Sequence, residues 1–148
     1  MPLPRPLVKS GEPHFSFAGL KSAVQRAVVS GKYRREDIAA SFQQAVIDCL
    51  VDRTRLALGE TDAPTLVMAG GVAANRPIRD AMASLAARSR RRFSVPPAWL
   101  CTDNAAMIAW AGAERFAAGL TDLLDVPARA RWPLDERAER VRGAGVKA

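Results

Sequence analysis

Two short segments, each placed where a loop enters a predicted helix, carry the residues most able to do chemistry. The first, residues 69–76 (AGGVAANR), follows the apolar run 65–68 (TLVM). Gly70 and Gly71 let the backbone turn sharply and approach a ligand, and the Asn75 amide can both donate and accept hydrogen bonds. A strand, a glycine turn and a helix in this order can direct backbone N–H groups at an anionic or nucleotide ligand. The alternative is an ordinary turn in which Asn75 only caps the helix that begins at Arg76.

The second segment, residues 100–109 (LCTDNAAMIA), presents the Asp103 carboxylate at a predicted helix start. A carboxylate can ligate a divalent metal ion. Aspartate is equally a favoured helix cap, because its charge suits the helix dipole. One aspartate does not complete a site of three or four ligands, so the chain alone is expected to bind a metal weakly. His14, the one histidine of the sequence, lies in the proline-rich opening without a partner.

The spacing of apolar residues predicts the elements that must position these groups. Helices are expected over 16–30, 35–58, 76–87 and 103–119, with Gly31 and Gly59 ending the first two. Strands are expected over 65–69, covered on both faces, and more weakly over 93–95. The prolines up to Pro13 indicate an extended connector. The order favours an α/β architecture, although two strands are few for a sheet.

Inward-facing side chains are expected on each of these helices. The first helix should bury residues Phe17, Leu20, Val24, Ala27 and Val28, and the second Ile38, Phe42, Ala45, Cys49 and Leu56. The third should bury Ile78, Met82 and Leu85, and the last carries Ala106, Met107, Trp110, Ala113 and Ala117. Beyond Thr121 the periodicity fades, and docking of this tail through Leu124, Val126 and Trp132 is expected.

Composition limits the class of protein. The 148 residues, 49% hydrophobic and 25% charged, are typical of one globular domain, and no apolar run approaches the roughly 20 residues that span a bilayer. The opening residues lack the apolar core of a secretory signal, so the cytoplasm is the expected compartment. Cys49 and Cys101 form no paired metal motif, and no histidine adjoins Cys101 to activate it. The net charge of +7 favours approach to a polyanion such as a nucleic acid, although charge alone does not establish RNA binding.

Two further basic features have competing interpretations. Lys21 ends the segment 15–21 (FSFAGLK), whose aromatic residues favour a hydrophobic staple with an exposed lysine over a ligand contact. The arginines of residues 88–92 (RSRRR) could pair with nucleic-acid phosphates, and a solvated loop explains them equally well.

The two segments, together with 15–21 and 37–43 (DIAASFQ), resemble the C-terminal part of the tRNA threonylcarbamoyladenosine synthase family, also called glycoprotease-like, of the actin-like ATPase superfamily. The motifs agree in order and spacing from about Leu3 to Gly119. The resemblance implies part of the second lobe of an actin-like ATPase fold, an α/β lobe that is mostly helical with a small parallel sheet. It divides the chain into a connector (1–15), a C-terminal lobe fragment (16–120) and a basic tail (121–148).

The resemblance also implies an acyltransferase activity. Members pass a threonylcarbamoyl group from threonylcarbamoyl-adenylate to the adenosine next to the anticodon, in tRNAs that read codons beginning with A. Asn75 matches the asparagine that contacts the adenylate, and Gly70 and Gly71 belong to the same motif. Asp103 matches a metal ligand, usually of iron, whose two histidine partners lie in a first lobe that this chain lacks. The expected partners are tRNA, the missing N-terminal lobe and other proteins of the modification complex, and the fragment alone is expected to be inactive.

Two alternatives remain at the level of sequence. The chain could be a non-catalytic remnant or partner-binding subunit that must associate with the missing lobe, through the sheet edge where further strands should pair. It could also be part of an actin-like kinase, because glycine turns at strand ends recur in that superfamily. Residues 101–107 (CTDNAAM) argue against the kinase.

Overall fold

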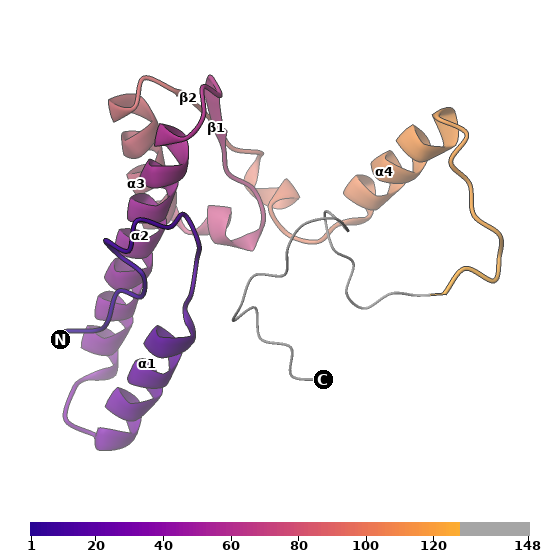
Figure 1. The fold of residues 1–148 in the computed structure, drawn as a ribbon. Helices are drawn as coiled ribbons and strands as arrows, with labels where there is room; N and C mark the ends of the chain where they lie inside the picture. The colour runs from indigo at the N-terminus through magenta and orange to yellow at the C-terminus, as the bar shows by residue number, and fades with distance from the viewer. Residues whose placement is uncertain (128–148) are drawn as a thin grey trace. The chain divides into compact units, whose positions relative to one another are not determined.

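The computed structural model describes residues 1–127, and Figure 1 shows the order of their elements. The helices are α1 (Ala18–Ser30), α2 (Arg35–Gly59), α3 (Arg76–Arg88) and α4 (Ala105–Ala117), the strands are β1 (Thr65–Val67) and β2 (Arg92–Ser94), and the short 3₁₀ turns are η1 (Gly71–Ala74) and η2 (Ala98–Leu100). The chain divides into a first unit, Met1–Asp103, and a second that begins at Asn104. The predicted mostly helical α/β fragment is confirmed.

Helices α1, α2 and α3 pack through the apolar residues that their spacing indicates. Three α3 side chains expected to face inward, Ile78, Met82 and Leu85, are buried and join Leu58 of α2 in one cluster. Burying each such side chain contributes about 2 kcal/mol to the free energy of unfolding. A second cluster joins α1 and α2 with the chain start, through Leu20, Ala45 and Leu3. The long helix α2 therefore supports both α1 and α3.

Some expected core positions of α1 and α2 are wrong. The side chains of Val28 and Phe42 are 51% and 42% exposed, because the stripe on each helix is wider than the surface its neighbour covers. Helix α1 ends as expected at Gly31, whose φ of 63° is the left-handed conformation that glycine adopts without strain. Helix α2 includes Gly59 as its last residue, one position beyond the predicted end.

The sheet consists of β1 and β2 in parallel, with Leu66 opposite Phe93. Helix α3 connects the two strands, as a parallel pair requires. The expectation that β1 is covered on both faces is wrong, because Val67 is 64% exposed. Parallel strands are usually buried on both sides. The described residues therefore leave one face of this sheet uncovered.

The proline-rich opening is less extended than its composition predicts. Backbone hydrogen bonds from Val8 N to Arg5 O (3.3 Å) and from Ser10 N to Leu7 O (2.9 Å) fold it into turns. Leu3 is buried, and the Arg5 guanidinium pairs with Asp48 of α2 at 2.9 Å. This segment is thus packed on α2.

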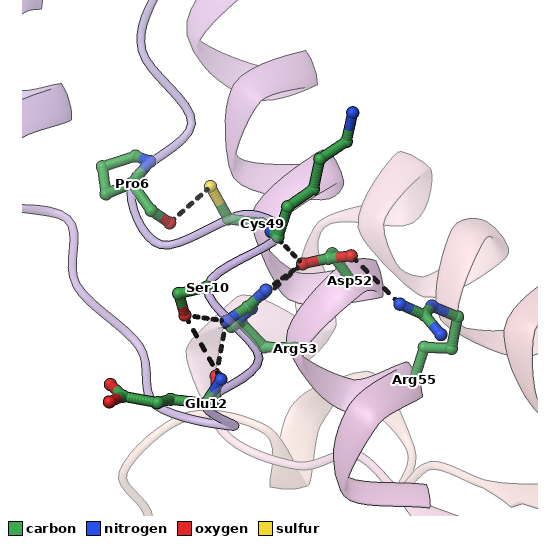
Figure 2. Close-up of polar contacts among 8 residues, drawn as sticks. Pro6, Ser10, Glu12, Cys49, Asp52, Arg53 and Arg55 are labelled. Carbon is green, nitrogen blue, oxygen red and sulfur yellow. Dashed lines mark hydrogen bonds and ion pairs between the residues drawn. The ribbon is translucent and has the colours of Figure 1, made fainter. Parts of the chain in front are cut away.

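Arg53 of α2 holds the same segment through buried hydrogen bonds, as Figure 2 shows. Its side chain is 1% exposed, and its guanidinium donates to Ser10 Oγ (2.8 Å), to the Glu12 carbonyl and to the Asp52 carboxylate. The Arg53 hydrogen bond holds the pKa of Asp52 below its usual value. A buried guanidinium requires such partners, because an unpaired buried charge is costly.

Helix α4 differs from the other helices because none of its residues is buried. Large apolar side chains on and beyond it are exposed, among them Ile108 (68%), Trp110 (70%) and Phe116 (76%). The docking expected of Leu124 and Val126 is wrong, because both are exposed, and Trp132 lies outside the described residues. Among residues 1–127, no helix combines the length and the apolar character needed to cross a bilayer.

Candidate functional site

The glycine turn leads directly from β1 into α3 and positions Asn75. Gly70 has a φ of 81°, a conformation that other residues rarely adopt, and the 3₁₀ turn η1 follows it. Asn75 is the N-cap of α3, and its Oδ1 accepts a hydrogen bond from Ile78 N at 3.2 Å. The capping interpretation of Asn75 is therefore correct as far as its oxygen is concerned.

The amide nitrogen of Asn75 has a separate partner on α2. Asn75 Nδ2 donates to Gln43 Oε1 at 3.3 Å, which joins two side chains 32 residues apart in the sequence. A primary amide has two N–H donors and two acceptor lone pairs. The half-buried Asn75 thus retains one N–H and one lone pair after its two described bonds. Capping and ligand binding do not exclude each other at this residue.

The second candidate segment presents Asp103 without using it as a cap. Asn104 caps α4 by accepting from Met107 N at 3.0 Å, so the predicted helix start at Asp103 is wrong by two residues. Asp103 itself is exposed. Just before it, the buried Cys101 thiol donates toward Pro96 O and Pro97 O, both at 3.6 Å. These contacts hold the segment in place and leave Cys101 without access to a substrate.

Both segments follow the carboxyl ends of neighbouring parallel strands. Residues 69–75 leave β1 directly, and residues 95–103 leave β2 through η2. In open α/β sheets, ligands bind in the crevice outside the carboxyl ends of the strands. Gly70, Asn75 and Asp103 therefore all lie in segments that follow the carboxyl ends of the strands.

The donor set for a metal is incomplete. Residues 1–127 contain no group of three or more histidine, cysteine, aspartate or glutamate side chains that could hold an ion. Asp103 and the exposed His14 therefore do not form a metal site with their neighbours. A single carboxylate fits one position in the coordination shell of a hard or borderline cation and no more.

The arginines of residues 88–92 differ in the contacts that they make. Arg91 is a structural residue, because its guanidinium donates to the carbonyl oxygens of Thr61 (2.8 Å) and Asp62 (3.1 Å) in the loop before β1. The remaining arginines of this segment, Arg88, Arg90 and Arg92, are exposed. They stay available for a phosphate contact or for solvent.

Lys21 is exposed, as the staple interpretation requires, beside an apolar cavity that the sequence did not indicate. The cavity of about 400 Å³ lies between α1 and α2. It is lined by Phe17, Ala18, Lys21, Val24 and Phe42.

Gln43 and Arg53 make contacts that sequence reasoning missed. Arg53 carried a signal, because it continues the buried positions Ala45 and Cys49 at the same four-residue interval. Gln43 carried none beyond its place in the 37–43 motif, because its partner Asn75 is distant in sequence.

A βαβ unit with a glycine turn and an asparagine N-cap after its first strand defines an α/β protein of the class that binds ligands at the carboxyl ends of its strands. Residues 1–110 match the family model TsaD, described as tRNA N6-adenosine threonylcarbamoyltransferase. The chain belongs to this family, and the resemblance in its motifs is confirmed.

Curated relatives give the same family name. The chain is similar to the tRNA N6-adenosine threonylcarbamoyltransferases of Sphingopyxis alaskensis (70% identical over 149 residues), Novosphingobium aromaticivorans (66% over 151) and Zymomonas mobilis (61% over 153). Each match covers 100% of this chain and 42% or 43% of the relative. The chain therefore spans less than half the length of these relatives.

Proposed function

We propose that this chain supplies one part of an enzyme that transfers a threonylcarbamoyl group from threonylcarbamoyl-adenylate to the adenosine next to the anticodon of tRNA. The observation that carries the proposal is Asn75, which caps α3 after the glycine turn that follows β1; its amide makes two hydrogen bonds and retains one N–H and one lone pair. Membership of the threonylcarbamoyltransferase family supports the substrate class. The segment that completes the relatives' length is the expected source of the remaining groups.

In this enzyme Asn75 binds and orients the adenylate. Its remaining N–H and lone pair match a nucleoside or carbonyl group, which presents both acceptors and donors. The positive φ of Gly70 makes the turn, and the absence of a β-carbon at Gly71 leaves the backbone open to the ligand, since nothing lies within 4 Å of a Cβ built there. Fixing the substrate in this way lowers the entropic part of the barrier.

Asp103 would supply one carboxylate ligand to a divalent metal, with iron as the candidate. Residues 1–127 do not hold a complete metal site, so the other ligands would have to come from outside this range. A metal bound there would supply stabilisation of developing negative charge. The role of Asp103 is supported by its exposure and by the assignment of the helix cap to Asn104.

The proposed partners are tRNA, the absent lobe and other proteins of the modification complex, and the proposed location is the cytoplasm. A net charge of +7 supports approach to tRNA. Among the exposed arginines, Arg88, Arg90 and Arg92 are the candidates for phosphate contacts.

A fusion tests this function. The chain is joined to the segment of the Sphingopyxis alaskensis relative that has no counterpart in it, and threonylcarbamoyladenosine in tRNA is measured by mass spectrometry after digestion. The wild-type fusion should modify tRNA, and Asp103→Asn should abolish the reaction. Asp125→Asn is the matched control, because Asp125 is also exposed but lies outside both motifs. Equal activity in the two variants would contradict the role of Asp103, and formation of a phosphorylated small molecule without tRNA would favour a kinase.

A second candidate function is partner binding without catalysis. The exposed apolar side chains of α4 and the uncovered face of β1 favour it, because a large unpaired apolar surface marks an interaction site. The same fusion separates the candidates. A remnant would associate with the complementary segment and produce no modified adenosine.

A further inference from the structure

Gln43 of α2 is the second residue that holds the amide of Asn75. Its Oε1 accepts from Asn75 Nδ2 at 3.3 Å, and both side chains are half-buried. The Ile78 N–H occupies Asn75 Oδ1 at 3.2 Å on the other side of the amide. The asparagine is therefore held between a donor and an acceptor.

The backbone N–H of Ile78 selects one orientation of the amide, because it can only donate. If the Asn75 amide turned by 180°, its nitrogen would face this N–H, donor to donor. Ile78 therefore sets which end of the amide faces Gln43. The bond to Gln43 Oε1 is the second point of attachment, and two points together fix the plane of the amide and the direction of its remaining N–H and lone pair.

We propose that Gln43 is a positioning residue for the adenylate, acting through Asn75 and without touching the ligand. The inference rests on the proposed function, because it requires Asn75 to contact the adenylate. Without Gln43, the cap still holds Oδ1, but the amide plane is free to rotate about it, and the remaining N–H loses its direction. A geometric displacement of this kind lowers affinity and rate although no ligand contact has been removed.

The chemistry that Gln43 must supply is acceptance of one hydrogen bond. Gln43→Glu keeps an oxygen at the same position, whereas Gln43→Met keeps the length of the side chain and removes the acceptor. The chain offers a matched control in the next residue of α2. Gln44 also makes a side-chain hydrogen bond, from Nε2 to Asp48 Oδ1 at 2.8 Å, but it does not contact Asn75.

The first measurement uses the 148-residue chain labelled with ¹⁵N. Hydrogen exchange of the Asn75 side-chain NH₂ group is followed by nuclear magnetic resonance in Gln43→Met, Gln43→Glu and Gln44→Met. Loss of one hydrogen bond should quicken this exchange about fivefold in Gln43→Met. The exchange rate should stay within about twofold of wild type in the other two variants. An unchanged rate in Gln43→Met would overturn the proposal without any reference to activity.

The second measurement uses the fusion with the complementary segment and AMP as the probe. Gln43→Met should weaken AMP binding about fivefold in calorimetry, while Gln43→Glu restores it and Gln44→Met leaves it unchanged. If Gln43 only filled space beside α3, Gln43→Met and Gln43→Glu should affect AMP binding alike, because the hydrogen-bond acceptor would not matter. Equal losses in the two variants would therefore contradict positioning.

Asn75→Ser separates failure of this inference from failure of the proposed function. Serine keeps a capping oxygen and removes both amide N–H groups. If Asn75→Ser weakens AMP binding and Gln43→Met does not, the positioning role alone is wrong. If neither variant changes AMP binding, Asn75 does not contact the adenylate, and the proposed site itself is wrong.

Discussion

Replacement of Asn75 by alanine and by serine tests whether this residue does more than cap α3. Alanine removes both the cap to Ile78 N (3.2 Å) and the bond to Gln43 (3.3 Å). Loss of a cap costs about 1 kcal/mol, and loss of a neutral hydrogen bond costs about 1 kcal/mol. Asn75→Ala should therefore lower the free energy of unfolding by about 2 kcal/mol. Asn75→Ser should lower it by about 1 kcal/mol, because the serine hydroxyl can still cap.

Ligand binding should follow a different order from stability. Both variants lack the amide N–H that we propose contacts the adenylate, so both should weaken AMP binding to the fusion by about fivefold or more. Unfolding of the chain is measured in urea by circular dichroism, and AMP binding by calorimetry. The signature of the site is a serine variant that recovers part of the stability and none of the affinity.

One result would refute this reasoning. If AMP affinity recovers together with stability in Asn75→Ser, the loss in Asn75→Ala comes from damage to α3 alone. Asn75 would then be a helix cap and nothing else.

Three further predictions concern α2. Arg53→Met should lower the free energy of unfolding in urea by about 3 kcal/mol, because it leaves the Asp52 carboxylate without its buried partner. The control, Arg55→Met, removes an exposed arginine and should cost about 0.5 kcal/mol or less. Equal costs would contradict the anchoring role of Arg53. The hydrogen bond from Arg53 holds the pKa of Asp52 below its usual range. The stability that this carboxylate contributes is therefore complete above the pKa of the unfolded state and is lost as the pH falls through the lower folded value. Asp52→Asn should flatten this acid loss in urea titrations at acid pH, and an unchanged slope would contradict it. Burial raises the pKa of the Cys49 thiol and shields it from reagents. Iodoacetamide at pH 8 should therefore label Cys49 far more slowly in the native chain than in urea, as measured by mass spectrometry. Equal rates would show that Cys49 is accessible in the native chain.

The local elements could be predicted from the sequence because their signals are local. The 3.6-residue spacing of apolar positions predicted α1, α2 and α3, and the glycine turn after residues 65–68 predicted the passage from β1 to α3. Gly31 ended α1 because the left-handed conformation favours glycine. Even the small error at Asp103 is local, since either Asp103 or Asn104 can cap a helix.

Contacts between distant segments could not be predicted from these signals. The hydrogen bond from Asn75 to Gln43 depends on how α2 and α3 pack, and nothing in either motif encodes that distance. Arg53 continues the buried stripe of α2, but nothing in the sequence indicates that Ser10 and Glu12 are its partners.

Helix α4 shows a different limit of sequence patterns. Its apolar residues predict an inward face, yet Trp110 is 70% exposed. The pattern records that a surface is apolar, and it does not say whether the same chain or another segment covers it.

The central claim is that this chain supplies a necessary part of a threonylcarbamoyl transfer site. The most direct test measures threonylcarbamoyladenosine formed in tRNA by three samples: the chain alone, the complementary segment of the Sphingopyxis alaskensis relative alone, and the two joined. The account predicts modified adenosine in the joined protein and in neither part by itself. Equal formation by the complementary segment alone, or none in the joined protein, would contradict it.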